Sequence, residues 1–322
     1  MRIVLRSRFL DAPLAALAAR HGAETVVADD AAAMRSAVGD ADALWLWPHF
    51  YDADLLAALE RAPRLRWLQL VTMGYDPIEE HGAPAHVTVT NAGDAYAPTV
   101  AEHAVASLLA LVRRIPAALE RARTQTWAQA EIGPRVGTLN GSTVAVLGFG
   151  NIGRAVAERL RGFDVRVVAV TRTGAPHPLA DECAAESALH EVLRRSDAVV
   201  VAVPLTARTR GMLNADALAA LPPHAVVVNV ARGPVIDQRA LADALANGTL
   251  GGAALDVVNP EPLPENDPLW SAPNVLITPH VAGFGGDVAA RRILALVERN
   301  LALFAAGRPL EAQVPVGAHA AS

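Results

Sequence analysis

The chain has 322 residues, of which 52% are hydrophobic and 19% charged, and its formal net charge is −5. This length is typical of two domains, and the low charge indicates well-buried sheets covered by helices rather than disorder. The lack of a basic surplus gives no electrostatic support for a nucleic-acid partner. The single cysteine, Cys183, excludes internal disulfides and argues against a cysteine-based metal site. We expect no metal, and we expect Cys183 to be neutral and partly buried.

The N-terminal segment carries arginines ahead of an apolar stretch, as many targeting and membrane segments do. Arg6, Arg8 and Asp11 interrupt its apolar residues, and no run reaches the roughly 18 residues that a membrane-spanning helix needs. We therefore expect a strand at residues 2–6, a helix at residues 12–20, and a soluble, cytoplasmic protein with no membrane partner.

Short β-branched runs alternate with alanine- and leucine-rich helical stretches, a pattern typical of parallel sheets with helices on both faces. The first series of predicted strands reads RIVL, ETVV, ALWLW, RWLQL and VTVT. The longest helical pattern follows at residues 98–114, where Pro98 suits the first turn of a helix.

A second series of strands begins after Gly141. Its six predicted strands are TVAVLG, VRVVAV, AVVVAV, AVVVNV, GGAALDV and NVLIT. A dinucleotide-binding domain requires six strands that alternate with helices in this way. A last helix is predicted at residues 288–307, and a return to the first domain is the simplest way for it to pack.

A glycine-rich turn joins the first strand of the second series to a helix predicted from Asn151 to about Arg161. Gly148 permits a tight turn, Gly150 lets the backbone approach a pyrophosphate, and Gly153 lets the helix pack closely on the strand. The helix N-terminus favours an anion. The string alone is weak evidence, but in this context it predicts that the chain binds a dinucleotide.

The end of the next strand, VVAVTRTG, lacks the acidic residue that would accept a hydrogen bond from a free ribose 2′-hydroxyl. It carries Thr171, Arg172 and Thr173 instead. Arginine can form paired hydrogen bonds with phosphate oxygens, and flanking hydroxyls can donate to them. The alternative is an ordinary surface arginine in a loop. We expect NADP(H) to be preferred, with NAD(H) possible.

Three further segments follow predicted strands: VNVARGPVID with Arg232, ALDVVNPEPLP with Glu261, and LITPHVAGFG with His280. Open α/β sheets bind ligands at the carboxyl ends of their strands. Each segment alone has a structural explanation, such as a turn, a loop or a capping group. Together with a nucleotide site, they predict a reaction centre.

With these motifs the sequence resembles the D-isomer-specific 2-hydroxyacid dehydrogenases over nearly its whole length. The resemblance begins at LRWLQLVTMGYD, continues through GFGNIGR and NVARGPVIDQRALADALANGTLGGAALDV, and ends at EPLPENDPLW and TPHVAGF. The Thr-Arg-Thr string is similar to that of NADPH-preferring glyoxylate and hydroxypyruvate reductases. The resemblance implies hydride transfer between the cofactor and a 2-oxo acid, giving a D-2-hydroxy acid.

The resemblance also assigns catalytic roles. Arg232 should hold the carboxylate or carbonyl of the substrate, and His280 should donate a proton to the carbonyl oxygen during reduction. Glu261 should favour the imidazolium and orient its ring, which an adjacent carboxylate can do.

Further residues are assigned contacts in the same way. The backbone N–H groups of Met73 and Gly74 should face the substrate carboxylate, and the alternative for Met73 is a core side chain. Asp256 should bind the nicotinamide carboxamide, and its alternative is a strand-end cap. Asn151 and Ile152 should contact the pyrophosphate. The residues implied along the cofactor cleft are Val203, Pro204 and Ala231.

The implied architecture is discontinuous. Residues 1–97 and 286–322 would form a flavodoxin-like substrate domain, and residues 98–285 an inserted Rossmann domain that binds the cofactor. Both would be doubly wound α/β domains with parallel sheets. A homodimer through the cofactor domain is implied, with the helix from Pro98 at its surface.

Several alternatives stay open. Trp45 and Trp47, in LWLWPHFYD, either line the substrate pocket or belong to the core. Trp127 resembles a tryptophan that reaches across the dimer in some hydroxypyruvate reductases. Rival functions are a cofactor-sensing corepressor and a dehydrogenase acting on formate or phosphite.

Overall fold

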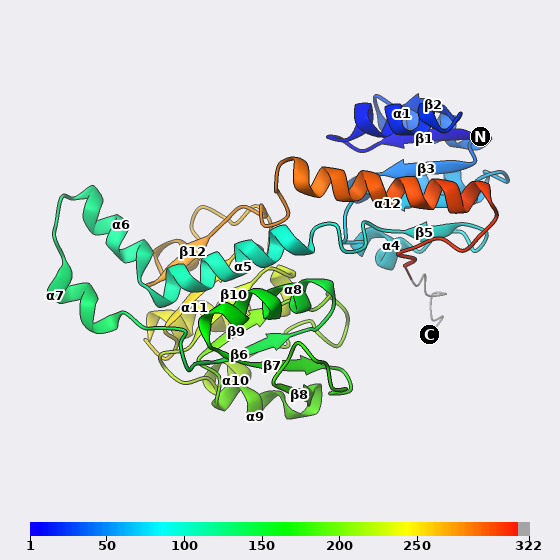
Figure 1. The fold of residues 1–322 in the computed structure, drawn as a ribbon. Coiled ribbons are helices and arrows are strands. Elements are labelled where there is room, and N and C mark those ends of the chain that lie inside the picture. Colours follow the sequence, from blue (N-terminus) through cyan, green and yellow to red (C-terminus); the bar gives the residue numbers. More distant parts are fainter. Residues whose placement is uncertain (315–322) are drawn as a thin grey trace. The chain divides into compact units, whose positions relative to one another are not determined.

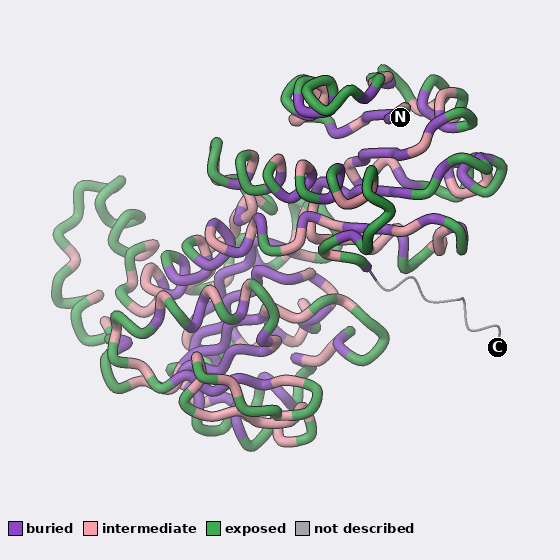
Figure 2. Tube along the Cα trace, turned by 45° about the vertical axis from the view of Figure 1, so that its right-hand side comes forward, coloured by how far each residue is buried: buried purple, intermediate pink, exposed green. Residues whose placement is uncertain are grey.

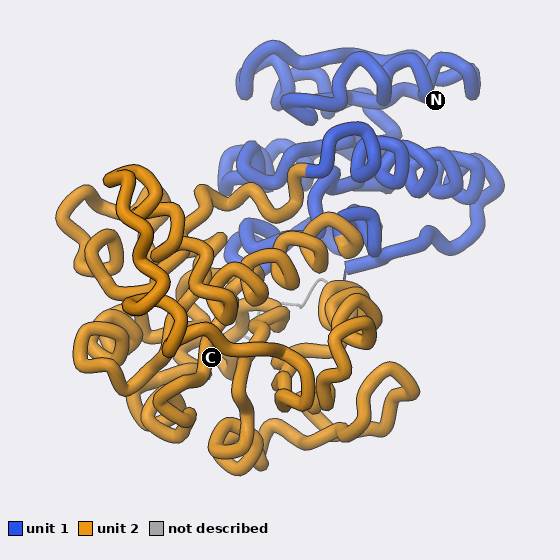
Figure 3. The backbone as a smooth tube through the Cα atoms, turned by 60° about the vertical axis from the view of Figure 1, so that its left-hand side comes forward, with its two compact units in different colours: residues 1–96, 285–322 blue, residues 97–284 orange. Residues whose placement is uncertain are grey.

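The computed structural model describes residues 1–314 and contains two compact units (Figure 3). Unit 1 consists of residues 1–96 and 285–322, and unit 2 of residues 97–284. Within the described part of the chain, no helix combines the length and the apolar character needed to cross a lipid bilayer.

Unit 1 is built on a five-stranded parallel sheet with the order β2-β1-β3-β4-β5 (Figure 1). Its strands are β1 (Arg2–Arg6), β2 (Glu24–Val27), β3 (Ala43–Leu46), β4 (Trp67–Leu70) and β5 (Thr88–Thr90). Its helices are α1 (Asp11–Arg20), α2 (Ala31–Ala37), α3 (Ala53–Glu60), α4 (Asp76–His81) and α12 (Asp287–Ala305). This strand order is that of flavodoxin-like sheets, as expected.

The two faces of this sheet have separate apolar cores. On one face, Leu44 and Leu46 pack against α2 and α3, and on the other Trp45 and Trp67 pack against α1 and α12. Because successive side chains of a strand point to opposite faces, a strand buried on both faces is largely apolar, and the buried Gln69 of β4 has its amide hydrogen-bonded to the Leu70 and Asn91 carbonyls. β3 and β4 are buried at every position. Figure 2 colours the buried stretches of the backbone purple and the exposed ones green.

Trp45 is therefore a core residue and not part of a substrate pocket. Its side chain is 0% exposed, and its ring meets Trp67 edge-on with the centroids 5.5 Å apart. The predicted return of the last helix is confirmed, because Ile293 and Val297 of α12 belong to the same core. Trp47 is only partly buried, and its indole N–H donates to His49 Nδ1 at 2.8 Å.

Unit 2 contains a seven-stranded parallel sheet with the order β12-β11-β10-β9-β6-β7-β8. Its strands are β6 (Thr143–Leu147), β7 (Arg166–Thr171), β8 (Glu182–Ala185), β9 (Ala198–Val201), β10 (Val226–Asn229), β11 (Gly252–Leu255) and β12 (Val275–Ile277). Its helices are α5 (Ala97–Val112), α6 (Ile115–Arg123), α7 (Gln129–Ile132), α8 (Asn151–Leu160), α9 (Leu189–Arg194), α10 (Ala215–Ala219) and α11 (Gln238–Ala246). The six predicted strands are all present, and β8 is an addition.

The additional strand β8 has the sequence ECAA, which contains no β-branched residue. It pairs at the edge of the sheet, with Cys183 opposite Ala169 of β7. Cys183 is free and of intermediate exposure, so its predicted partial burial is confirmed. Sheet pairing with β7, rather than local propensity, explains this strand.

The predicted helix at residues 98–114 ends earlier in the structure. Helix α5 stops at Val112, and Arg114 adopts a left-handed φ of 56° before α6 begins. Neither α6 nor α7 has a buried residue, and both extend away from the sheet of unit 2 (Figure 1). Trp127 between them is 91% exposed. We call residues 115–132 the arm.

Candidate active site

The three residues predicted to be catalytic follow neighbouring strands of unit 2. Arg232 comes after β10, Glu261 after β11 and His280 after β12. Because these strands are adjacent and parallel, the segments that follow them leave the same edge of the sheet. The fold of unit 2 therefore brings the three residues to one edge, where open α/β sheets bind ligands.

His280 and Glu261 form a hydrogen-bonded pair. The distance from His280 Nδ1 to Glu261 Oε2 is 2.8 Å, and the two side chains are 48% and 38% exposed. The hydrogen bond that His280 donates to Glu261 raises the pKa of His280 above its usual value, against the effect of burial, and the charge of Glu261 adds to the rise. Since Nδ1 is used by Glu261, Nε2 is the ring nitrogen left for a substrate.

Glu261 is affected in the complementary direction. Burial acts to raise its pKa, but the hydrogen bond and charge of His280, the Val258 N–H and the charge of Arg232 together lower it, and the pKa of Glu261 is below its usual value. Its Oε1 also accepts a hydrogen bond from the Val258 N–H at 3.3 Å. The pair is thus electrostatically matched, with a carboxylate that stabilises an imidazolium.

Arg232 is placed by a loop that Asn229 organises. The side-chain amide of Asn229 donates to the Arg232 carbonyl at 3.0 Å and accepts from the Ala231 N–H at 3.0 Å. Gly233 has to lack a side chain, since a Cβ there would lie 2.0 Å from the Val258 carbonyl oxygen. The charge of Arg232 opposes the rise in the pKa of His280 and adds to the lowering of the pKa of Glu261, so Arg232 acts electrostatically on both members of the pair.

Asp256 caps the loop that carries His280. Its side chain is 2% exposed, and it accepts hydrogen bonds from the Thr278 hydroxyl at 2.7 Å and from the N–H groups of Val281 and Ala282 at 2.9 Å. The His280 N–H donates to the Asp256 carbonyl at 2.8 Å. The capping alternative for Asp256 is therefore observed. Sequence reasoning did not select Asn229 or Thr278, because neither side chain has a chemistry that singles it out.

The glycine turn has the geometry that a dinucleotide requires. Gly148 has φ +89° and Gly153 lies so close to the turn that a Cβ there would be 2.1 Å from the Gly148 carbonyl oxygen. At Gly150 a Cβ would meet nothing within 4 Å, so protein packing does not demand glycine there. Helix α8 begins at Asn151. Open space before a helix N-terminus suits a pyrophosphate, and unit 2 fits a dinucleotide.

The segment after β7 folds back towards this turn. The ring of His177 meets Phe149 at a centroid distance of 5.1 Å, and the Thr171 hydroxyl accepts a hydrogen bond from the Gly174 N–H at 3.0 Å. Arg172 and Thr173 are exposed. Within residues 1–314, Arg172 forms no ion pair, so its guanidinium is available to an anion.

The remaining predicted cofactor residues follow β9, which lies beside β6, and β10, the next strand of the sheet. Val203 and Pro204 follow β9, and Ala231 follows β10. A Cβ added at Gly148 would lie 2.9 Å from Val203 Cγ1, so Val203 borders the glycine turn.

Met73 and Gly74 belong to unit 1 and follow β4. The Met73 carbonyl accepts a hydrogen bond from Asn91 Nδ2 at 2.9 Å, and the Gly74 carbonyl accepts one from the Thr72 hydroxyl at 3.0 Å. In the described chain, the backbone N–H groups of Met73 and Gly74 have no acceptor. Two free N–H groups in a fixed loop can bind an anion. Met73 is partly buried against the core.

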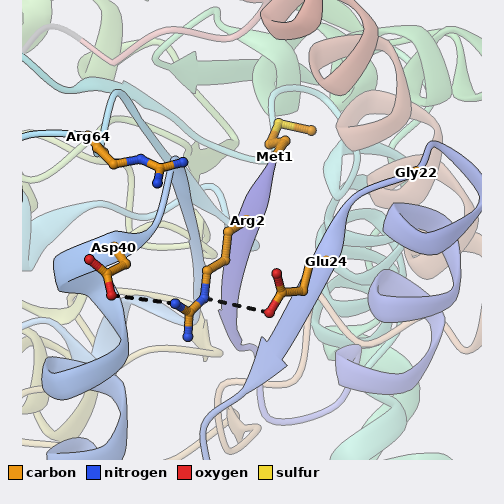
Figure 4. Close-up of a pocket in the computed structure, with 6 residues that line it drawn as sticks. All are labelled: Met1, Arg2, Gly22, Glu24, Asp40 and Arg64. Carbon is orange, nitrogen blue, oxygen red and sulfur yellow. Dashed lines mark ion pairs between the residues drawn. The ribbon is translucent and has the colours of Figure 1, made fainter.

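A hollow in unit 1 lies at the amino ends of β1 and β2 (Figure 4). Arg2 pairs there with Glu24 at 3.9 Å and with Asp40 at 3.6 Å, so its charge is already balanced. The residues that line the hollow are Met1, Arg2, Gly22, Glu24, Asp40 and Arg64. We assign it no function. Among residues 1–314, no cluster of His, Cys, Asp and Glu could hold a metal ion.

The chain is similar to known proteins in sequence and in fold. Residues 105–282 match the family model described as "D-isomer specific 2-hydroxyacid dehydrogenase, NAD binding domain". Glyoxylate reductase of Pyrococcus furiosus is 39% identical over 255 residues, which are 77% of this chain and 75% of that protein. The family match, residues 105–282, covers most of unit 2 and includes the glycine turn.

Two solved structures extend the similarity to the whole fold. A D-isomer specific 2-hydroxyacid dehydrogenase family protein from Aeromonas salmonicida has a TM-score of 0.84 and 30% identity, covering 98% of this chain and 99% of that one. A D-isomer specific 2-hydroxyacid dehydrogenase from Xanthobacter autotrophicus Py2, solved with NADPH and MES, has a TM-score of 0.81 and 30% identity, covering 97% of both chains. The chain belongs to the D-isomer specific 2-hydroxyacid dehydrogenase family and is an oxidoreductase with an NAD(P)-binding domain.

Proposed function

We propose that the protein uses NADPH to reduce a small 2-oxo acid of the glyoxylate or hydroxypyruvate type to a D-2-hydroxy acid. The observation that carries the proposal is the His280–Glu261 pair, with its 2.8 Å hydrogen bond, in the same unit as a glycine turn that fits a dinucleotide. The bound cofactor would supply the hydride. The side chains of this protein would bind the acid, orient it and provide the proton.

His280 is the proposed proton donor. Its raised pKa keeps more of the imidazole protonated near neutral pH. The Nδ1–H group of His280 would stay hydrogen-bonded to Glu261. Its Nε2–H group would donate a proton to the carbonyl oxygen of the substrate as negative charge develops there. In the oxidation direction the neutral ring would accept the proton from the hydroxyl group. Positioned proton transfer of this kind accelerates reactions by about 10²–10⁴-fold.

Arg232 and the loop after β4 are the proposed substrate ligands. A guanidinium can form two parallel hydrogen bonds with a carboxylate, and it stays charged at every working pH. The free N–H groups of Met73 and Gly74 would bind the carboxylate as well. Fixed donors of this kind lose little entropy when the acid binds.

The cofactor proposal names a set of residues on unit 2. Gly148, Gly150 and Gly153 would shape the turn, Asn151 and Ile152 would contact the pyrophosphate, and Asp256 would offer its Oδ2 to the carboxamide. Val203, Pro204 and Ala231 would line the path of the cofactor.

The preference for NADPH depends on Thr171, Arg172 and Thr173. The exposed Arg172 without an ion pair supports it, because a 2′-phosphate would give the guanidinium a partner. The similar Xanthobacter autotrophicus protein has been solved with NADPH. NADH remains a possible second cofactor.

We also propose a homodimer formed through the arm. Ile115, Leu119 and Trp127 expose apolar surface there, and such surface is typical of protein–protein contacts. Trp127 would then contact the second copy. The cytoplasmic location stays a prediction.

One experiment tests the function and its rivals together. Purified protein is mixed with NADPH or NADH and a panel of 2-oxo acids that includes glyoxylate, hydroxypyruvate and phenylpyruvate, and absorbance at 340 nm is followed. We expect turnover of the small acids, faster with NADPH. Absence of turnover across the panel would favour a corepressor-like sensor. NAD-linked oxidation of formate or phosphite would favour that class of dehydrogenase.

A further inference from the structure

A second histidine lies behind the loop that carries His280. His103 is on α5, which packs against β10, β11 and β12 (Figure 1). Its Nε2 is 3.0 Å from the Thr278 hydroxyl oxygen and 3.6 Å from Asp256 Oδ1. His103 thus contacts both residues that hold the loop, although 175 positions separate it from Thr278.

The directions of these hydrogen bonds are fixed by proton count. A threonine hydroxyl has one proton, and the hydroxyl of Thr278 donates it to Asp256 Oδ1 at 2.7 Å. Its oxygen can therefore only accept from His103, which places a proton on Nε2 of His103. The chain of donors runs from His103 through Thr278 to the carboxylate of Asp256.

The Asp256 carboxylate in turn fixes the backbone of the loop that carries His280. The same carboxylate accepts the N–H groups of Val281 and Ala282, which follow His280 directly. His280 itself has a left-handed φ of +53°, a conformation that costs free energy in a residue other than glycine and persists only when the surroundings enforce it. The hydrogen bonds to Asp256 are the surroundings that enforce it here.

We propose that His103 is a positioning residue for the reaction. By donating to Thr278, it fixes the rotamer of Thr278 and the orientation of the Asp256 carboxylate, and so holds the backbone of residues 278–282 in the form that presents the His280 imidazole. The inference rests on the proposed role of His280 as proton donor. It adds His103, on helix α5, to the residues that position the His280 imidazole.

Two pairs of variants test the donor chain. In His103→Leu the donor is lost, whereas in His103→Gln an amide N–H can still reach Thr278. Thr278→Val breaks the chain at its middle member, whereas Thr278→Ser keeps the hydroxyl. Glu102→Leu is a control on the same helix, because Glu102 is exposed and its ion pair with Arg159 of α8 involves neither Thr278 nor Asp256.

Two readouts are needed. The first is hydrogen–deuterium exchange of a peptide covering residues 278–284 in the cofactor-free protein, which reports the order of the loop without any turnover. The second is kcat and KM for the best 2-oxo acid of the panel. All measurements are made well below the melting temperature of each variant.

We expect His103→Leu and Thr278→Val to speed exchange in this peptide and to lower kcat by about 10–100-fold, the scale of a misplacement near 1 Å, with little change in KM for the 2-oxo acid. His103→Gln, Thr278→Ser and Glu102→Leu should stay near wild type in both readouts. The rescue by glutamine and serine separates the donor role from simple packing of α5.

Wild-type exchange and kcat in His103→Leu would overturn the inference. So would faster exchange with an unchanged kcat, because the loop order would then be irrelevant to the chemistry. A failure to rescue with glutamine and serine would assign His103 to packing alone. A wild-type protein without turnover on any acid would instead overturn the proposed function, and with it the catalytic part of the inference.

Discussion

Glu261 Oε2 lies 2.8 Å from Nδ1 of His280, and the two residues come from segments that follow the adjacent strands β11 and β12. The hydrogen bond fixes which ring nitrogen is free and raises the pKa of the imidazole. This one hydrogen bond therefore determines that the proton leaves from Nε2 of His280, and it widens the pH range in which His280 is protonated.

Replacing Glu261 with Gln should shift the pH dependence of reduction to lower pH. Reduction needs protonated His280, so kcat/KM should fall as pH rises through the pKa of His280. The carboxylate holds that pKa above its usual value, and a neutral amide removes the effect. The measurement is kcat/KM for the 2-oxo acid between pH 5 and pH 9. An identical profile for both proteins would contradict the assigned role of Glu261.

The same pair predicts a pH-dependent contribution to stability. The folded pKa of His280 is raised, so its contribution is complete below the unfolded value of roughly 6.5 and is lost as pH rises through the folded value. The folded pKa of Glu261 is lowered, so its contribution is complete above the unfolded value near ~4.3 and is lost as pH falls. The stabilisation by the pair is therefore greatest between these two values.

Melting temperatures of the wild type and of Glu261→Gln measure this effect. The difference between them should be small, because both side chains are more than a third exposed, and it should peak between about pH 4.3 and 6.5. A difference that kept growing at alkaline pH would contradict the assignment of charges.

The glycine turn predicts opposite effects for two alanine substitutions. Gly153→Ala would place a Cβ 2.1 Å from the Gly148 carbonyl oxygen, whereas Gly150→Ala would place one in open space. Gly153→Ala should lower the melting temperature by several degrees, in line with ~1–3 kcal/mol for overpacking. Gly150→Ala should melt like wild type and bind the cofactor more weakly. Equal stability of the two variants would contradict the geometry of the turn.

Much of the fold could be predicted from the sequence because the central strands of both sheets are parallel and buried on both faces. Such strands are continuous apolar runs, and Val199 and Val200 of β9 are examples, since both are fully buried. Strand β8 was not predicted because its pairing with β7, not its own residues, makes it a strand. The arm was not predicted either, because the break between α5 and α6 falls at Arg114, a residue type that rarely adopts a left-handed φ.

The site was predictable in a similar way. Charged or titratable residues after neighbouring strands, such as Arg232 and His280, could be selected from the sequence. The capping role of Asp256 and the contact of His103 with Thr278 depend on where α5 and the loop after β12 lie in space. No spacing in the sequence encodes that contact.

Replacing Arg172 with Ala should discriminate between the two cofactors. If the guanidinium binds a 2′-phosphate, its loss should weaken NADPH by roughly 10–100-fold, the range expected for hydrogen bonds to charged groups of ~1.5–3 kcal/mol, and leave NADH nearly unchanged. Dissociation constants from titration of cofactor fluorescence provide the measurement. Equal weakening of both cofactors would remove the 2′-phosphate hypothesis.

The most direct test of the account is the turnover of His280→Ala with NADPH and the preferred 2-oxo acid, measured beside the cofactor dissociation constant of the same variant. Loss of a positioned proton donor should lower kcat by about 10²–10⁴-fold, while cofactor affinity stays close to that of the wild type. A variant that keeps wild-type kcat would show that the proton comes from elsewhere, and it would contradict the central claim.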